Sequence, residues 1–337
     1  MLPARRAAIV GVAGTALTPA ERDLLAALPP VGVILFARNI ADPAQLAALI
    51  ADLRAAIPGV LLMVDQEGGR VARLRPPHWP TRPAAATLAT EEAARAGGQA
   101  IGRDAAGAGF DIVAAPVLDR ALPGASDVIG DRAFPGDAHA VARLGGAFAA
   151  GLRDAGIIPV AKHVPGHGRA RVDSHAALPV VEGEDSLDLL PFAENRALPW
   201  MMTAHVLFTA WDRERPATLS PFILREIVRR RIGFAGVLVS DDLAMGALAG
   251  LHGLAAPADR ALACLDAGCD LAMWCPGYAA TAEVLRAVPP VTPAAEARLA
   301  RGPHLAGSPS LAGSPSLAGS LGAPAAGGGS RRSGILL

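Results

Sequence analysis

The stretch KHVPGHGRARVDSH, residues 162–175, gathers a lysine, three histidines and an aspartate among glycines and a proline. Such side chains could hold a metal ion, bind a phosphate group, or move a proton during catalysis. Lys162 is also the only lysine in a chain of 337 residues, because arginine occupies every other strongly basic position. An ammonium is a compact point charge, unlike the planar guanidinium fork. Because it lies beside this cluster of histidines and glycines, we expect Lys162 to have a functional role.

A metal site is the weaker interpretation of this stretch. His163 and His167 would share one face of a helix, but Pro165 and the nearby glycines disfavour a regular helix. The glutamate of the HExxH motif is absent, and no cysteine lies nearby. We expect no metal and no other cofactor, although a zinc-dependent barrel of the amidohydrolase type stays open. The glycine spacing also matches no nucleotide-binding loop.

Proton transfer is the stronger interpretation of the same stretch. Asp173 and His175 are two residues apart, and in an extended segment such residues point to the same side. The carboxylate could then bind one ring nitrogen, fix the imidazole tautomer and raise its basicity, which leaves the other nitrogen to move a proton. We predict that Asp173 and His175 form a general acid/base pair.

Two further motifs place carboxylates at the ends of apolar runs. In GFAGVLVSDD the run ends at Asp241 and Asp242, which should face opposite sides of a strand. A carboxylate aimed into a barrel mouth can act as a nucleophile toward an anomeric carbon, whereas Asp242 could cap the following helix. In VDQEGGRVAR, Asp65 and Arg73 could clamp sugar hydroxyls, or form a buried ion pair that holds the loop.

A repeating scaffold is needed to position these motifs. Eight apolar runs recur along the chain, separated by amphipathic segments such as 42–57, 137–156 and 220–233. Continuous apolar runs are typical of strands covered on both faces, and eight alternations favour a single (β/α)8 barrel, an α/β fold, over an open sheet. The predicted barrel spans residues 1–300, with strands at 7–14, 31–37, 60–67, 110–119, 157–163, 200–208, 234–242 and 269–276.

The ends of these predicted strands are unusually polar. Charged groups that close an apolar strand are poor structural choices unless they face a site, and the active sites of such barrels lie at the carboxyl ends of the strands. We therefore predict a catalytic centre at that end. The polar residues at the ends of the runs are its candidates: Asp65, Glu67, Asp119, Lys162, His163, His205, Asp241 and Asp242.

Composition excludes several classes of function. Lys and Arg number 31, as do Asp and Glu, so the formal charge is zero and nothing favours nucleic-acid binding. No apolar run is long enough to span a membrane, and three cysteines without a CxxC pattern favour reduced thiols in the cytoplasm. Residues 301–337 repeat LAGSPS, which predicts a disordered, low-complexity tail. We expect a monomer.

Taken in order, VDQEGGRVARLR, VIGDRAF, KHVPGHG…DSH, MTAHV and GVLVSDDLAM resemble the motifs of glycoside hydrolase family 3. More narrowly, the chain is similar to the bacterial single-domain β-N-acetylhexosaminidases of cell-wall recycling, over nearly all of residues 7–290. The resemblance implies a retaining exo-β-N-acetylglucosaminidase that releases terminal GlcNAc from peptidoglycan fragments, with a small carbohydrate or muropeptide as its substrate.

The resemblance also implies roles for individual residues. Asp241 matches the family's nucleophile, and Asp173 with His175 matches an acid/base pair that replaces the usual second carboxylate. Histidine acid/base members can also pass the glycosyl group to phosphate, so a β-N-acetylglucosaminide phosphorylase with the same residues stays open, as does a non-catalytic sugar-binding barrel. The family's sugar-binding positions fall on Asp65, Arg73, Arg132, Lys162 and His163.

Overall fold

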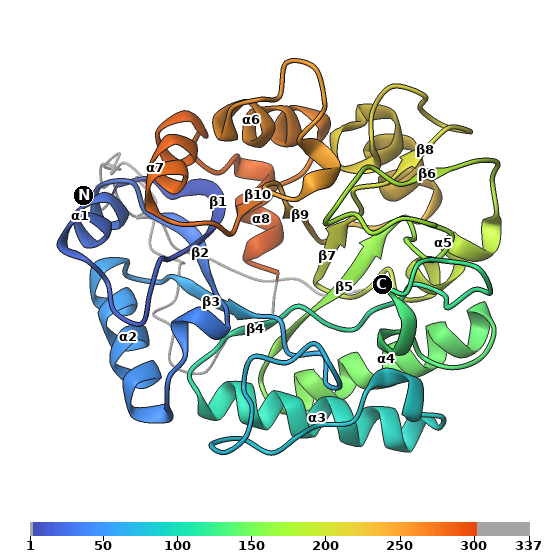
Figure 1. The fold of residues 1–337 in the computed structure, drawn as a ribbon, viewed down its shortest axis with the longest axis horizontal. Helices are drawn as coiled ribbons and strands as arrows, with labels where there is room; N and C mark the ends of the chain where they lie inside the picture. Colours follow the sequence, from blue (N-terminus) through green and yellow to red (C-terminus); the bar gives the residue numbers. More distant parts are fainter. Residues whose placement is uncertain (1–2, 302–337) are drawn as a thin grey trace, which may run out of the picture.

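The computed structural model describes residues 3–301, which form a closed barrel of eight parallel strands with helices outside it (Figure 1). Around the barrel the strands follow the order β1-β10-β9-β7-β5-β4-β3-β2. The predicted (β/α)8 fold is therefore confirmed. The predicted tail, beyond Arg301, lies outside the described residues. No helix within 3–301 is long and apolar enough to cross a membrane.

Every predicted strand overlaps an observed barrel strand, and most observed strands are shorter. The largest difference lies in 110–119, where the strand ends at Val113: the Ala115 N–H bonds back to the Val113 carbonyl, and Pro116 has no N–H to donate. The barrel strands are β1 Arg6–Gly11, β2 Pro30–Leu35, β3 Leu61–Val64, β4 Ile112–Val113, β5 Ile158–Val164, β7 Trp200–Thr203, β9 Val237–Asp242 and β10 Leu271–Trp274.

The predicted strand 200–208 is only partly correct. Its first half is β7, but its last two residues leave the barrel as β8, Leu207–Phe208. This segment pairs with β6, Val180–Val181, in a separate two-stranded sheet beside the barrel. The small sheet connects the segment after β5 to the segment after β7.

Helices connect successive strands and cover the outside of the barrel. The predicted segments 42–57, 137–156 and 220–233 are helical, although the third has π-type hydrogen bonding. The helices are α1 Pro19–Ala27, α2 Pro43–Ala56, α3 Glu91–Gly107, α4 Ala138–Asp154, α5 Ser186–Glu194, the π-helix Ile223–Arg231, α6 Pro257–Ala267, α7 Tyr278–Ala287, α8 Pro293–Leu299, and short 3-10 turns at Ala37–Asn39, Ala85–Thr87, Gly130–Arg132, Ala217–Leu219 and Gly246–Leu248.

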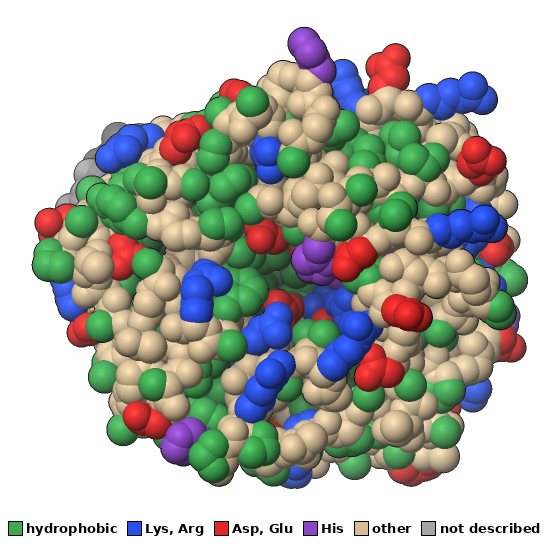
Figure 2. All heavy atoms as spheres, viewed as in Figure 1, with side chains coloured by type: hydrophobic (Ala, Val, Ile, Leu, Met, Phe, Trp, Pro, Cys, Tyr) green, Lys and Arg blue, Asp and Glu red, His purple; other side chains and the backbone are tan. Residues whose placement is uncertain are grey.

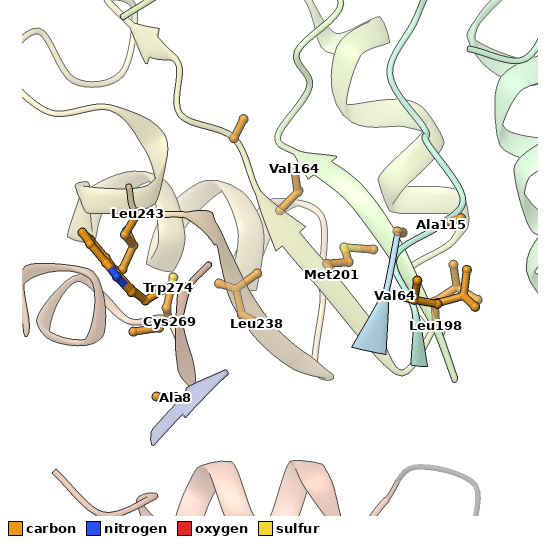
Figure 3. Packing of buried hydrophobic residues seen from close by; sticks show 14 of the residues in the cluster. Ala8, Val64, Ala115, Val164, Leu198, Met201, Leu238, Leu243, Cys269 and Trp274 are labelled. Atoms are coloured by element: carbon orange, nitrogen blue, oxygen red, sulfur yellow. The ribbon is translucent and has the colours of Figure 1, made fainter. Parts of the chain in front are cut away.

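The apolar core has two layers because consecutive strand residues face opposite ways. Inside the barrel, Ile9, Met63 and Trp200 belong to one buried cluster. Between the strands and the helices, neighbours such as Ala8 and Met201 belong to a second and larger cluster (Figure 3). The chain's sequence runs are continuously apolar for this reason: both faces of each strand are covered.

The amino end of the barrel is closed. Val291 and Leu299, before and within α8, pack against the inner cluster, and Arg5 forms an ion pair with Glu296 of the same helix, at 2.6 Å. With this end covered, the opposite end, where the strands finish, is left to carry a site.

Candidate active site

A cavity of about 160 Å³ lies at the carboxyl ends of the barrel strands. Figure 2 shows a hollow near the centre of this face, with acidic, basic and histidine side chains gathered around it. Apolar side chains, among them Phe36, Met202 and Met273, form part of the wall. Every residue that the sequence assigned to catalysis or sugar binding, except Asp173, lines the cavity: Asp65, Arg73, Arg132, Lys162, His163, His175 and Asp241.

Five charged side chains form a connected network at the bottom of the cavity, which we call the floor network: Asp65, Glu67, Arg73, Arg132 and Lys162. Lys162, from β5, places its Nζ 2.9 Å from Asp65 Oδ1 and 2.6 Å from Glu67 Oε1. Arg132 binds both oxygens of Glu67, at 2.8 and 2.9 Å. The Arg73 guanidinium lies 3.3 Å from Asp65 Oδ2.

Burial and charge act in opposite directions in the floor network. Burial alone would raise the pKa of Glu67, but Lys162 and Arg132 outweigh it and hold that pKa below its ordinary value. Burial would likewise lower the pKa of Lys162, whereas Asp65 and Glu67 raise it. Both partners are therefore charged, and three cations with two carboxylates give the floor network a formal net charge of +1.

The carboxylate of Asp241 lies at the end of β9 and faces the cavity. Its Oδ1 accepts a hydrogen bond from the backbone N–H of Asp242 at 2.8 Å, and its Oδ2 is 3.9 Å from His163 Nε2. Burial would raise the pKa of Asp241, but His163 and His205 more than offset this and lower it. Asp241 is therefore ionised at neutral pH, as a nucleophile must be.

His163 is held toward Asp241 by a buried carboxylate. Asp119 Oδ2 lies 2.6 Å from His163 Nδ1 and also accepts the backbone N–H of His163, at 3.1 Å. The other oxygen of Asp119 accepts the backbone N–H of His167, at 2.6 Å. One carboxylate at the end of a strand-like segment thus orients both histidines of the KHVPGHG motif.

Asp242 has a different environment from its neighbour Asp241. Its Oδ1 accepts the backbone N–H groups of Ala244, at 3.0 Å, and Cys275, at 3.1 Å. The next helix, α6, begins only at Pro257, so the expected helix cap is replaced by a cap of the turn after β9. Burial raises the pKa of Asp242.

The predicted acid/base pair lies at the rim, in the segment 165–179 between β5 and β6, which we call the acid/base loop. Asp173 Oδ1 is 2.8 Å from His175 Nδ1 and also accepts the backbone N–H of His175. The expected contact is present, but in a turn rather than an extended segment, because the Asp173 carbonyl accepts from Ala176 and Ala177. The His175 side chain is 65% exposed, and its Nε2 has no hydrogen bond within 3–301.

Several functional neighbours were not assigned roles from the sequence. Glu67, Asp119 and His205 could be recognised only as polar residues at strand ends, a signal that does not name their partners. His205 contacts Thr218 Oγ1 through Nδ1 at 2.8 Å and the Asp242 carbonyl through Nε2 at 3.0 Å. Arg70, in the same motif as Arg73, pairs with Asp131 at 2.7 Å.

Each of the two buried histidines of the opening stretch has one ring nitrogen in contact with a protein group, while His167 Nδ1 has no hydrogen-bond partner within 3–301. His163 Nδ1 contacts Asp119, and His167 Nε2 lies 3.1 Å from Ser174 Oγ. In the part of the chain that the structure describes, no group of three or more His, Cys, Asp or Glu side chains is arranged to hold a metal ion.

Comparison with known proteins gives a consistent family. A bacterial protein named β-hexosaminidase, from Methylococcus capsulatus, is 42% identical over 286 residues, which cover 82% of this chain and 84% of that protein. The structure of NagZ from Neisseria gonorrhoeae in complex with N-trifluoroacetyl-D-glucosamine is similar at a TM-score of 0.74 and 32% identity, over 88% of this chain and 93% of that one.

A longer relative shares the same fold. The structure of a glycoside hydrolase family 3 β-N-acetylglucosaminidase from a Paenibacillus species is similar at a TM-score of 0.76 and 35% identity. The match covers 83% of this chain but only 56% of that one. The model of the glycosyl hydrolase family 3 N-terminal domain matches residues 9–299. The chain therefore belongs to glycosyl hydrolase family 3 and is a glycoside hydrolase, as its motifs predicted.

Proposed function

We propose that this glycoside hydrolase is a retaining exo-β-N-acetylglucosaminidase that releases terminal β-linked GlcNAc from peptidoglycan fragments. One observation carries the proposal: the ionised carboxylate of Asp241 and the imidazole of His175 line the same cavity from two different segments. A nucleophile and a proton carrier around one sugar site are the two components that a retaining glycosidase needs.

In the first step Asp241 attacks the anomeric carbon. Its carboxylate oxygen forms a bond to that carbon, while the bond from the carbon to the leaving oxygen breaks and the electron pair stays on the oxygen. Protonated His175 donates its Nε2 proton to that oxygen. Asp173 orients the ring through the 2.8 Å contact at Nδ1 and stabilises the imidazolium.

In the second step water replaces the enzyme at the anomeric carbon. Neutral His175 accepts a proton from the water, whose oxygen bonds to the carbon as the bond to Asp241 breaks. Two inversions at one carbon give net retention. Throughout, the floor network and His163 are placed to hold the sugar hydroxyls, since Asp65, Arg73, Arg132, Lys162 and His163 all line the cavity.

The size of the cavity and the names of the relatives support the proposed substrate class. At about 160 Å³, the cavity is smaller than the roughly 300–1,000 Å³ of drug-sized ligand sites, which suits a single terminal sugar. The relatives are named for β-hexosaminidase or β-N-acetylglucosaminidase activity. Three buried free cysteines support action in a reducing compartment such as the cytoplasm.

Covalent labelling tests the proposed nucleophile. A 5-fluoro glycosyl fluoride of GlcNAc slows breakdown of the intermediate, so mass spectrometry of a digest should find the sugar on the peptide that contains VLVSDDLAM, at Asp241. NMR of the first product formed should show the β-anomer. A label on Asp242, or an α-anomer as first product, would overturn the mechanism.

Substrate and acceptor are tested separately from the nucleophile. Aryl β-glycosides that differ at C2 should be cleaved well only when they carry the acetamido group, and a muropeptide should release free GlcNAc. The same reactions with added inorganic phosphate address the alternative: release of GlcNAc 1-phosphate in place of GlcNAc would make the enzyme a phosphorylase.

A further inference from the structure

Ser174 stands between the two members of the acid/base pair but points the other way. The side chains of Asp173 and His175 are 46% and 65% exposed, whereas Ser174 is only 3% exposed. Its Oγ lies 3.1 Å from His167 Nε2. The Ser174 side chain therefore anchors the turn that carries Asp173 and His175, although the proposed mechanism does not use Ser174.

His167, which contacts Ser174, is itself held in place by a hydrogen bond and by burial. Its backbone N–H donates to Asp119 at 2.6 Å, and the same carboxylate holds His163, the imidazole next to Asp241. His167 is 3% exposed. Burial, with the nearby His163, lowers the pKa of His167 to about 4. The neutral ring can therefore hold the Ser174 hydroxyl without adding a positive charge beside His163.

The segment after the nucleophile forms a second support. The backbone N–H of Ala247 donates to the Ser174 carbonyl at 3.0 Å, and that of Gly246 donates to the His175 carbonyl at 3.2 Å. A Cβ atom added at Gly246 would lie 2.5 Å from the His175 carbonyl oxygen. Because real Cβ atoms do not approach that closely, only glycine permits this contact.

We propose that His167, Ser174 and Gly246 are positioning residues that set the location of His175 relative to Asp241. The inference rests on the proposed acid/base role of His175. Its physical basis is that Gly246 is five residues after Asp241, so one short segment carries the nucleophile and supports the proton carrier. Proton transfer needs a heavy-atom distance of about 2.6–3.2 Å, and a 1 Å displacement can cost about 10²-fold in rate.

Leaving-group dependence is the measurement that isolates this role. An alkyl β-GlcNAc glycoside needs protonation of its leaving oxygen, whereas a dinitrophenyl glycoside does not. For Gly246→Ala, we expect kcat/KM for the alkyl glycoside to fall about 10- to 100-fold, and kcat/KM for the dinitrophenyl glycoside to stay within about threefold. Gly250→Ala is the matched control, since a Cβ there meets nothing within 4 Å, and both substrates should stay within about twofold.

Ser174→Ala tests the same role without added bulk. Losing one hydrogen bond should reduce kcat/KM for the alkyl glycoside about 3- to 10-fold, again with little change for the dinitrophenyl glycoside. This variant also covers the case in which Gly246→Ala lowers the Tm too far to assay. If both variants reduce the two substrates equally, the contacts support the fold alone and the positioning role is wrong.

His175→Ala, assayed in parallel, separates this inference from the proposed function. If His175→Ala itself shows no leaving-group dependence, His175 is not the acid and both proposals fail. If His175→Ala shows it while Ser174→Ala and Gly246→Ala do not, only the positioning inference fails. We expect all three variants to share the pattern, strongest in His175→Ala.

Discussion

The floor network and the acid/base loop lie on the same cavity but are held in different ways. Lys162 is 3% exposed and sits between two carboxylates on the ends of barrel strands. His175 is 65% exposed, and its loop is held by Ser174 and by backbone hydrogen bonds to the segment after β9. In the floor network, stability and ligand binding therefore depend on the same charges, whereas the exposed Asp173–His175 pair can be altered with little effect on stability.

The physical reason for this difference is solvent. Removing one member of a buried ion pair leaves the partner's charge unpaired, at a cost of about 3–5 kcal/mol, while an exposed pair contributes about 0–1 kcal/mol. Substitutions in the floor network should therefore change the Tm as well as the kinetics, and substitutions at His175 should change kinetics alone. The predictions below test that division.

The largest effect is expected at Asp241, which lies between the two regions. Asp241→Asn removes the nucleophile while keeping its size, so kcat/KM should fall about 10⁴-fold. Asp242→Asn is the matched control, because an amide oxygen can still accept from Ala244 and Cys275. If steady-state assays show the greater loss for Asp242→Asn, the two carboxylates have the opposite roles.

The next largest effect is expected for His175→Ala, and it should differ between the two chemical steps. An activated aryl glycoside needs little protonation, so its first step should survive and produce a burst of phenolate, while hydrolysis of the intermediate slows about 10²- to 10⁴-fold. Azide needs no base and should accelerate that second step, with a β-glycosyl azide as product. Stopped-flow absorbance measures the burst.

Asp173→Asn should change the same traces less, because it removes only the group that orients the imidazole. The Tm of both variants should match the parent protein. A His175→Ala enzyme with neither burst nor azide rescue would place the proton carrier elsewhere, with His163 and Glu67 the first residues to test.

Lys162→Arg should show the coupling of binding and stability in the floor network. The larger, planar guanidinium cannot occupy the ammonium position between Asp65 and Glu67. We expect kcat/KM to fall by a factor that corresponds to about 1–3 kcal/mol of transition-state stabilisation, and the Tm to fall as well. Arg143 forms an exposed ion pair with Glu91 and provides the control. Arg143→Lys should change neither the Tm, measured by calorimetry, nor kcat/KM. A Lys162→Arg enzyme within about twofold of the parent would make the single lysine incidental.

Acid denaturation should reveal the smallest of these effects, which is the pH dependence that the Glu67 carboxyl adds to stability. The pKa of Glu67 is lowered in the folded protein, so Glu67 contributes stability above its unfolded value, about 4.3, and that stability is lost as the pH falls. The Glu67→Gln variant should therefore have a lower free energy of unfolding at pH 7. Below about pH 4 its free energy of unfolding should fall less steeply than that of the parent, with slopes that differ by at most about 1.4 kcal/mol per pH unit. Urea unfolding at several pH values measures both; parallel curves would contradict the pairing.

Much of the architecture could be predicted because it depends on local patterns. Continuous apolar runs separated by amphipathic segments are sufficient for eight strands and their helices, and the polar residues that end the runs mark the open end of the barrel. The boundaries were less predictable: 110–119 was expected to be one strand, but β4 covers only Ile112–Val113, because the Ala115 N–H bonds back to the Val113 carbonyl and Pro116 has no N–H.

The sequence by itself determined which chemical groups reach the cavity. Strand ends in a closed parallel barrel converge, which brings Asp65, Lys162, His163 and Asp241 together, and the motifs and the family resemblance added Arg73, Arg132 and His175. Only the tertiary structure decided which partners far away in the sequence they meet. Glu67 meets Arg132 across 65 residues, and Lys162 meets Asp65 across 97. Such pairs depend on the register of distant strands and on the course of loops. The same holds for Gly246 beneath His175, where the close approach of two loops, and no motif, requires glycine.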